Sequence, residues 1–176
     1  PIVDPSPAES SETELTWVGC GITKKAFMGA LAKAWTVESG ITVKLSGGGA
    51  TRGIRDVAAG LADMGGTCRH KIVDAAELDC HVHPVGWDAL AVIVHPDNPI
   101  EAISFEKLRD VMQGRITDWS ELGGTPGPIE LFIRKGKTSG VGLMGRELLF
   151  ADASMDYSAA AKQFKSSGPL ERTLEK

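Results

Sequence analysis

The 176-residue sequence lacks several features that mark specialised classes of proteins. Its longest apolar run is far shorter than the ~20 residues that a membrane-spanning helix needs. No basic segment followed by an apolar one opens the chain, so we expect no signal peptide in the sequence as given. The formal net charge of -4 gives no excess positive charge for binding nucleic acid or an anionic membrane surface. The 42% of hydrophobic residues and 24% of charged residues are typical of a globular protein.

Cysteine is also scarce, with three residues at positions 20, 68 and 80. They allow at most one internal disulfide and leave one thiol over. No pair has the Cys-x-x-Cys spacing of a zinc or redox motif. On a strand, His81 and His83 would face the same side, but this pair alone is not a zinc signature. Cys20, Cys68, His81 and His83 are therefore only weak candidates for a metal site.

The sequence also lacks the usual catalytic patterns. No Ser-His-Asp order, His-Glu-x-x-His motif or pair of carboxylates stands out. We therefore expect no enzymatic activity and no cofactor.

The length suits one ordinary domain or two small lobes. Residues 1–14 contain three prolines, several serines and acidic residues, which is typical of a flexible leader. We assign residues 15–85 to a first lobe and residues 86–176 to a second.

Strands and helices alternate in the first lobe. Short strands are predicted at 15–19, 41–45 and 62–65, with helices between them. This order indicates parallel βαβ units. The helix over 24–38 has an apolar stripe that we expect in the core, formed by Phe27, Ala30, Leu31, Ala34 and Trp35.

Each of these strands ends in a glycine-containing turn, at 20–23, 47–52 and 65–69. Ligands of such sheets sit beyond the carboxyl ends of the strands, so the three turns should open on the same side. The run from Gly47 to Gly49 also precedes a helix. It is either a plain strand-to-helix turn or a loop whose N–H groups cradle an anion. No Gly-Lys-Ser/Thr follows, so it is not a Walker A loop.

In the second lobe, the apolar residues from 85 to 95 predict a buried strand. A helix should begin after Ser104 and end near Gly114. A strand is predicted at 129–133, followed by the turn 134–140 and a helix through Leu149. The segments 157–165 and 169–176 have weak helical patterns.

Three stretches together resemble a known family. They are Gly47 to Arg69 (Gly-Gly-Gly-Ala-Thr-Arg-Gly-Ile, then Gly-Leu-Ala-Asp-Met-Gly and Cys-Arg), Gly86 to Pro99, and Leu108 to Gly124. Their order is similar to that of the PstS-like phosphate-binding proteins of ABC importers, a branch of the periplasmic solute-binding proteins. The resemblance covers residues 16–150.

This resemblance implies an α/β fold of the type II periplasmic-binding-protein class, with two lobes of βαβ units around a ligand cleft. It implies an extracytoplasmic or periplasmic protein that captures a small oxyanion, most simply phosphate, for the membrane subunits of an ABC importer. Closure of the lobes would sequester the ligand.

The resemblance and the glycine turns also predict the ligand contacts. Arg134 offers a planar fork to a tetrahedral oxyanion, and Asp63 could accept a hydrogen bond from a protonated phosphate. Alternatively, Arg134 belongs to a solvated basic loop, and Asp63 ties its strand to neighbouring backbone. The predicted set is Gly21, Thr23, Gly49, Thr51, Arg52, Asp63, Thr67, Arg69, Arg134, Thr138, Ser139 and Gly140.

The sequence departs from the family where Ile22, Ala50 and Cys68 replace residues that carry hydroxyl groups. Thr23, Thr51 and Thr67 could supply some of these donors. The alternative function is therefore a sensor or scaffold with the same fold, in which the cysteines and histidines serve metal or redox signalling.

Two further hypotheses follow. Family members run longer, and a shortened second lobe would expose a sheet edge that could support a homodimer or segment exchange. In the family's strand order, Cys20 and Cys68 follow neighbouring strands. They could then form a disulfide or hold a soft metal together, or be two unrelated buried residues.

Overall fold

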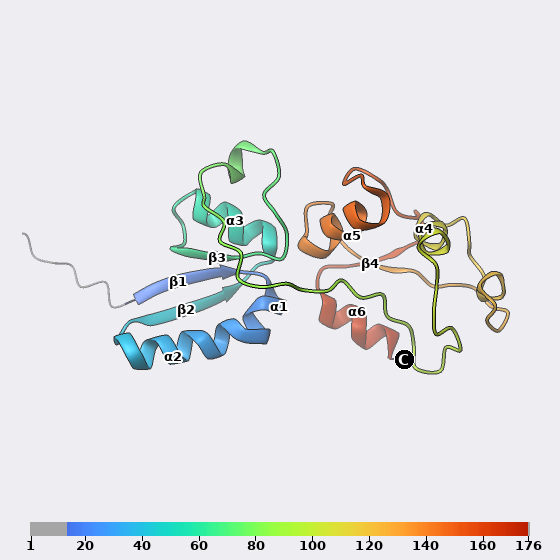
Figure 1. Cartoon of the computed structure of the whole chain (residues 1–176), viewed down its shortest axis with the longest axis horizontal. Helices are drawn as coiled ribbons and strands as arrows, with labels where there is room; N and C mark the ends of the chain where they lie inside the picture. The colour runs from blue at the N-terminus through green and yellow to red at the C-terminus, as the bar shows by residue number, and fades with distance from the viewer. Residues whose placement is uncertain (1–13, 176) are drawn as a thin grey trace, which may run out of the picture. The chain divides into compact units, whose positions relative to one another are not determined.

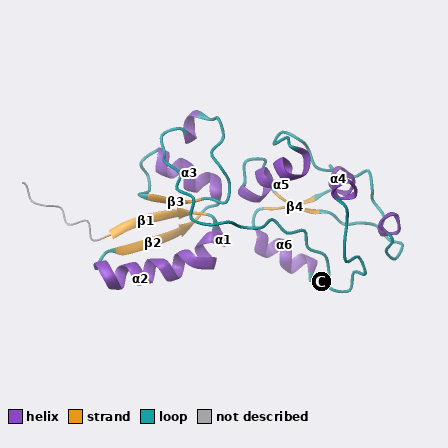
Figure 2. Cartoon of the chain, viewed as in Figure 1, coloured by secondary structure: helices purple, strands orange, loops and turns teal. Residues whose placement is uncertain are grey.

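The computed structural model describes residues 14–175 and divides the chain into two compact units, one ending at Val82 and the next beginning at His83. The sequence analysis placed the boundary after residue 85. Each unit contains both helices and strands (Figures 1 and 2). The predicted leader falls outside the described residues except for Glu14, which already belongs to the first strand.

The first unit is built on a parallel sheet of three strands, β1 (Glu14–Gly19), β2 (Thr42–Gly47) and β3 (Met64–Gly66). The order β2-β1-β3 is the one that the resemblance predicted. Trp17 lies opposite Leu45 on one side and Met64 on the other. Its side chain is buried, so the centre of β1 anchors the core of this unit.

Helices cover this sheet: α1 (Gly21–Thr23), a π-helical turn (Lys24–Met28), α2 (Gly29–Ser39), α3 (Ala50–Ala58) and a 3-10 turn (Ala75–Glu77). The chain runs from β1 to β2 and then back past β1 to β3. With right-handed crossovers, this reversal places α2 and α3 on opposite faces of the sheet, as Figure 1 shows.

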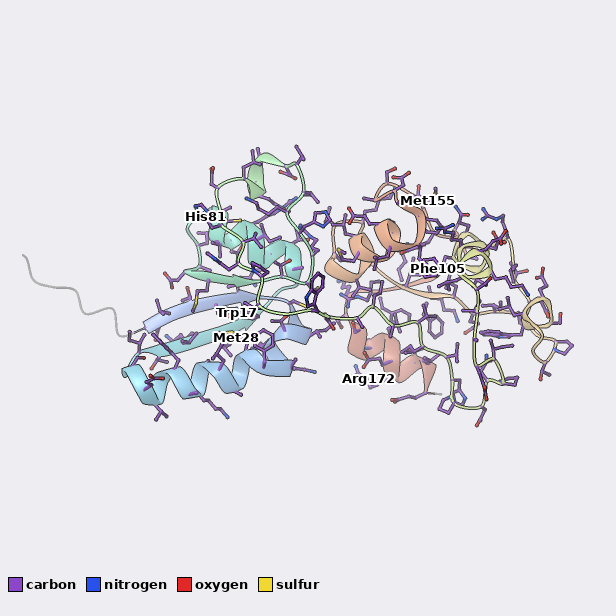
Figure 3. All side chains as sticks on the ribbon, in the orientation of Figure 1. Trp17, Met28, His81, Phe105, Met155 and Arg172 are labelled. Atoms are coloured by element: carbon purple, nitrogen blue, oxygen red, sulfur yellow. The ribbon has the colours of Figure 1, made fainter. Side chains whose placement is uncertain are left out.

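The apolar stripe predicted for the first helix is wrong as a core face. Phe27, Leu31 and Trp35 are 42%, 54% and 45% exposed, and Ala30 and Ala34 are exposed as well. The helix instead buries Met28 and Ala32 (Figure 3 labels Met28). The apolar pattern does not say which side of the helix meets the sheet, and the helix turns this stripe away from it.

Helix α3 approaches the sheet closely because glycines line the contact. A Cβ atom built at Gly53 would lie 2.7 Å from the carbonyl oxygen of Gly66. One built at Gly65 would lie 2.2 Å from the carbonyl oxygen of Gly53. Both obstacles are backbone atoms, so no side chain can move aside. The glycines thus bring the start of α3 down to the strand ends.

We expect Gly65→Ala to lower the free energy of unfolding by about 1–3 kcal/mol, because the added methyl group must push α3 away from β3. Urea unfolding would measure the loss. Gly47→Ala, in β2, is the matched control, since nothing lies within 4 Å of its added Cβ. Equal losses in the two variants would contradict close packing as the cause.

The second unit contains α4 (Phe105–Gln113), a 3-10 turn (Trp119–Leu122), β4 (Phe132–Arg134), α5 (Gly140–Phe150), β5 (Lys162–Phe164) and α6 (Ser167–Leu174). Strands β4 and β5 form a parallel pair. The predicted helix after Ser104 is confirmed. The hydroxyl of Ser104 accepts a hydrogen bond from the Lys107 N–H at 3.2 Å, and Gly114 ends the helix at a φ of 75°.

Two predictions for this unit are wrong. The segment 85–95 forms no strand and its side chains are largely exposed, because no described strand pairs with it. The weak helical pattern at 157–165 contains β5 instead, since pairing with β4 decides the structure of so short a run. Within residues 14–175, no helix combines the length and apolarity needed to traverse a bilayer.

Candidate functional site

The three glycine-containing turns of the first unit meet at the carboxyl edge of its sheet. The Cys20 N–H donates to the Gly66 carbonyl at 2.9 Å. The N–H groups of Gly48 and Gly49 both donate to the Gly19 carbonyl, at 3.1 and 3.0 Å. These bonds join the turns after β1, β2 and β3, so the predicted convergence is confirmed.

The same bonds change the expected role of the glycine run. The N–H groups of Gly48 and Gly49 point to Gly19 and are not offered to a ligand. Gly49 adopts a φ of 86° at the start of α3, which favours glycine. No side chain caps α3, and a helix leaves its first N–H groups without acceptors in the helix. The first turn of α3 therefore has N–H groups without a side-chain cap, where the helix dipole is positive.

Arg69 was expected to contact the anion, and the structure gives it an internal partner. Its two Nη groups donate to the carboxylate of Glu77 at 2.8 and 2.7 Å, and Nη2 also donates to the Thr51 hydroxyl at 3.2 Å. The side chains of Arg69 and Glu77 are both fully buried. Arg69 thus positions Thr51 at the start of α3, while Glu77 neutralises its charge.

Glu77 is a residue that the sequence analysis missed. Its carboxylate also accepts from Arg55 Nε at 3.1 Å and from the Ile72 N–H at 3.2 Å. The hydrogen bonds from Arg69, more than any other contact, lower the pKa of Glu77 to about 2. Glu77 lies in the polar run 71–79, which has no periodic signal that could have predicted a buried carboxylate.

Asp63 lies at the amino end of β3 and not at the carboxyl edge where the turns meet. It accepts hydrogen bonds from the backbone N–H and the hydroxyl of Thr16, both at 2.7 Å. The Thr16 hydroxyl, first among these contacts, lowers the pKa of Asp63 below its usual value. This is the alternative role, in which the aspartate ties β3 to its neighbour.

Two other predicted contacts are engaged locally. Arg52 is exposed and pairs with Asp56 on its own helix at 2.8 Å. The Thr67 hydroxyl donates to the Arg69 carbonyl at 2.9 Å and accepts from the Arg69 N–H at 3.1 Å, which closes its own turn.

At the turn after β1, Gly21 is exposed and Thr23 is half-buried. Cys20 Sγ lies 3.5 Å from Cys68 Sγ, so the predicted proximity of these two cysteines is confirmed. The contact with Cys68 is the largest influence that lowers the pKa of Cys20, to about 5. After the contact with Cys68, the turn of Ile22 and Thr23 also lowers the pKa of the Cys20 thiol.

In the second unit, Arg134 is the last residue of β4. Its Nη1 donates to the Ser167 hydroxyl and its Nη2 to the Lys165 carbonyl, both at 2.8 Å. Its Nε–H is buried and has no hydrogen-bond partner among the described residues. The guanidinium is therefore held in place by two bonds while its buried Nε–H stays unused.

The turn after Arg134 leads directly into α5. Ser139 caps this helix, accepting from the Gly142 N–H at 3.2 Å and donating to the Gly136 carbonyl at 2.9 Å. Thr138 is half-buried and Gly140, the first residue of α5, is buried. Ser139 thus caps α5.

The weak metal candidates do not assemble. His81 and His83 are exposed and lie outside any strand. Among the described residues, no group of three or more His, Cys, Asp or Glu side chains could hold a metal ion. Two hollows, of about 150 and 240 Å³, lie in the second unit, and no predicted ligand contact lines either.

Solved structures define the class of this fold. A protein of Clostridium perfringens, described as a phosphate ABC transporter substrate-binding protein with bound phosphate, matches with a TM-score of 0.83 and 21% identity over 92% of this chain and 65% of its own. An ABC-type phosphate transport receptor of Vibrio cholerae matches with a TM-score of 0.67 and 23% identity over 92% of this chain and 66% of its own. The fold is that of the type II periplasmic binding proteins.

Sequence comparison gives the family. A model described as a PBP superfamily domain matches residues 7–167, and the chain belongs to this family. The phosphate-binding protein PstS of Bacillus subtilis is 28% identical over 72% of this chain and 43% of its own length. PstS 2 of Streptococcus pneumoniae is 29% identical over 55% of this chain and 33% of its own. The chain thus spans less than half the length of these relatives.

Proposed function

We propose that this chain captures a small tetrahedral oxyanion, with phosphate as the favoured ligand, as the extracytoplasmic solute-binding protein of an ABC importer. The family and the fold support binding as its task, without catalysis. The names of its relatives support phosphate. The membrane subunits of the importer would be its protein partners.

The unused donor of Arg134 carries the proposal. A buried N–H without a partner is costly, and the cost disappears when an acceptor arrives. A guanidinium matches the oxygens of a tetrahedral anion and stays charged at every physiological pH. Arg134 is also immobilised by Ser167 and Lys165, so it need not be ordered when the anion binds.

The first unit, taken by itself, has its own group of candidate donors. The uncapped start of α3 supplies N–H groups and partial positive charge. The Thr51 hydroxyl is held there by Arg69. Within the second unit we assign contacts with the anion to Arg134 and the turn of Thr138 to Gly140, and within the first unit Thr23 and Thr51 are the candidate contacts. Gly49 and Arg69 support the site without contacting the anion, and Asp63 stands outside it.

The proposal is tested by thermal unfolding of the intact chain with phosphate, sulfate, molybdate and divalent metals. A ligand at 100 times its dissociation constant stabilises the folded state by about 2.7 kcal/mol. We expect phosphate to raise the melting temperature in a concentration-dependent way, and the metals to leave it unchanged. A rise with metals alone would favour the sensor and contradict oxyanion capture.

The homodimer or segment exchange expected from the sequence stays a prediction. The sheet of the second unit has only two strands among the described residues, and unpaired strand edges favour pairing with another chain.

A further inference from the structure

Two thiols face each other at the carboxyl edge of the first unit's sheet. Cys20 follows β1 and Cys68 follows β3, and these strands are neighbours. The hydrogen bond from the Cys20 N–H to the Gly66 carbonyl fixes one turn against the other. The two Sγ atoms lie 3.5 Å apart.

We propose that Cys20 and Cys68 form a disulfide that links the turns after β1 and β3. A disulfide bond is about 2.05 Å long, so the sulfurs must approach by about 1.5 Å. The two cysteines follow neighbouring strands whose last paired residues are Gly19 and Gly66, so they are offset by one position just past the strand ends. The bond requires a movement of the sulfurs that rotation of the two side chains can supply.

The surroundings of Cys20 favour its thiolate, which is the reactive form. The contact with Cys68 and then the turn of Ile22 and Thr23 lower the pKa of its thiol. Cys20 is only 6% exposed, whereas Cys68 is half-buried. An external oxidant therefore meets Cys68 first, and Cys20 is placed to complete the bond.

The oxidant is a low-molecular-weight disulfide, and the reaction is two exchanges. The Cys68 thiolate attacks one sulfur of this molecule, forms a mixed disulfide and displaces the first small thiolate. The Cys20 thiolate then attacks Cys68 Sγ, forms the internal bond and displaces the second small thiolate. The proton of Cys68 ends on the first released thiolate, and the second released thiolate takes its proton from water, because Cys20 already reacts as its thiolate. The protein loses two electrons, and the small disulfide gains them.

Cys80 provides an internal reference. It is buried, and its Sγ donates to the Glu77 carbonyl at 3.5 Å. It should therefore remain a thiol when the other two cysteines react. The proposal concerns the chemistry of Cys20 and Cys68 alone and does not depend on oxyanion binding.

The test is thiol counting on the intact chain after incubation with oxidised glutathione and then denaturation. We expect one reactive thiol in place of three, a loss in mass of two hydrogen atoms, and a linked peptide that contains Cys20 and Cys68. Dithiothreitol should restore all three thiols. Cys80→Ser should leave none after oxidation, and Cys68→Ser should show no internal bond.

Three reactive thiols after oxidation would overturn the proposal, and so would a peptide that links Cys80 to either partner. If the thiols of Cys20 and Cys68 were unreactive but became reactive after a chelator was added, the proposal would also be overturned, since this result would indicate a shared metal ion. Because the wild-type chain is counted after denaturation, the result does not depend on whether the variants fold.

Discussion

Replacing Glu77 with Gln should lower the free energy of unfolding by about 3–5 kcal/mol, because the change leaves the buried charge of Arg69 without its counterion. Both side chains are fully buried. The amide can accept from only one of the two Nη groups that now bind the carboxylate. Urea unfolding of the wild-type chain and the variant would measure the loss.

Asp74→Asn is the matched control. Asp74 pairs with Arg55 at 2.8 Å, and its side chain is 38% exposed. An exposed ion pair contributes about 0–1 kcal/mol. Asn can also keep the cap that Asp74 provides to the Ala76 N–H. If Asp74→Asn lowered the free energy of unfolding as much as Glu77→Gln, burial of the Arg69–Glu77 pair would not be the cause of the loss.

The lowered pKa of Glu77 gives the same variant a second readout. Folding lowers the pKa of this carboxyl from 4.5 to about 2. Its contribution to stability is therefore complete above the unfolded pKa of 4.5 and is lost as the pH falls toward 2. Other carboxyls titrate in both the wild-type chain and Glu77→Gln. The difference between their free energies of unfolding, followed against pH, therefore isolates the contribution of Glu77. The difference should shrink as the pH falls through this window.

The sequence analysis succeeded where short-range signals dominate. Alternating apolar runs and glycine turns predicted β1, β2 and β3. Ser104 and Gly114 marked both ends of α4. The turns after the strands met as predicted, because parallel strands carry their carboxyl ends to one edge of the sheet.

The sequence analysis failed where the structure of a segment depends on a packing partner that is distant in the sequence. The stripe of Phe27, Leu31 and Trp35 is apolar, but the pattern does not say which side of the helix meets the sheet. The run 85–95 has a strand's composition and no described partner strand. Glu77 pairs with Arg69 in three dimensions, and a single sequence shows no sign of such a pair. The charge and spacing of Arg134 were visible, but its fixation by Ser167 was not.

Replacing Arg134 with Ala should weaken oxyanion binding by about 2–5 kcal/mol, which corresponds to roughly 30-fold or more in the dissociation constant. The variant removes the charge and the buried Nε–H that we assign to the anion. Arg134→Lys keeps the charge and loses the planar fork, so its affinity should fall between those of the wild type and Arg134→Ala.

Arg134→Ala also loses the hydrogen bonds to the Ser167 hydroxyl and the Lys165 carbonyl. Circular dichroism must therefore show that it remains folded. Arg172→Ala is the control for the loss of a positive charge in the same unit, because Arg172 is an exposed residue of α6 (Figure 3).

A calorimetric titration of the intact chain with inorganic phosphate tests oxyanion capture most directly. The wild-type chain and Arg172→Ala should give the same saturable curve with one phosphate per chain, and folded Arg134→Ala should give a much weaker one. If the wild-type chain shows no saturable binding, or folded Arg134→Ala binds phosphate as tightly as the wild type, oxyanion capture through Arg134 is wrong.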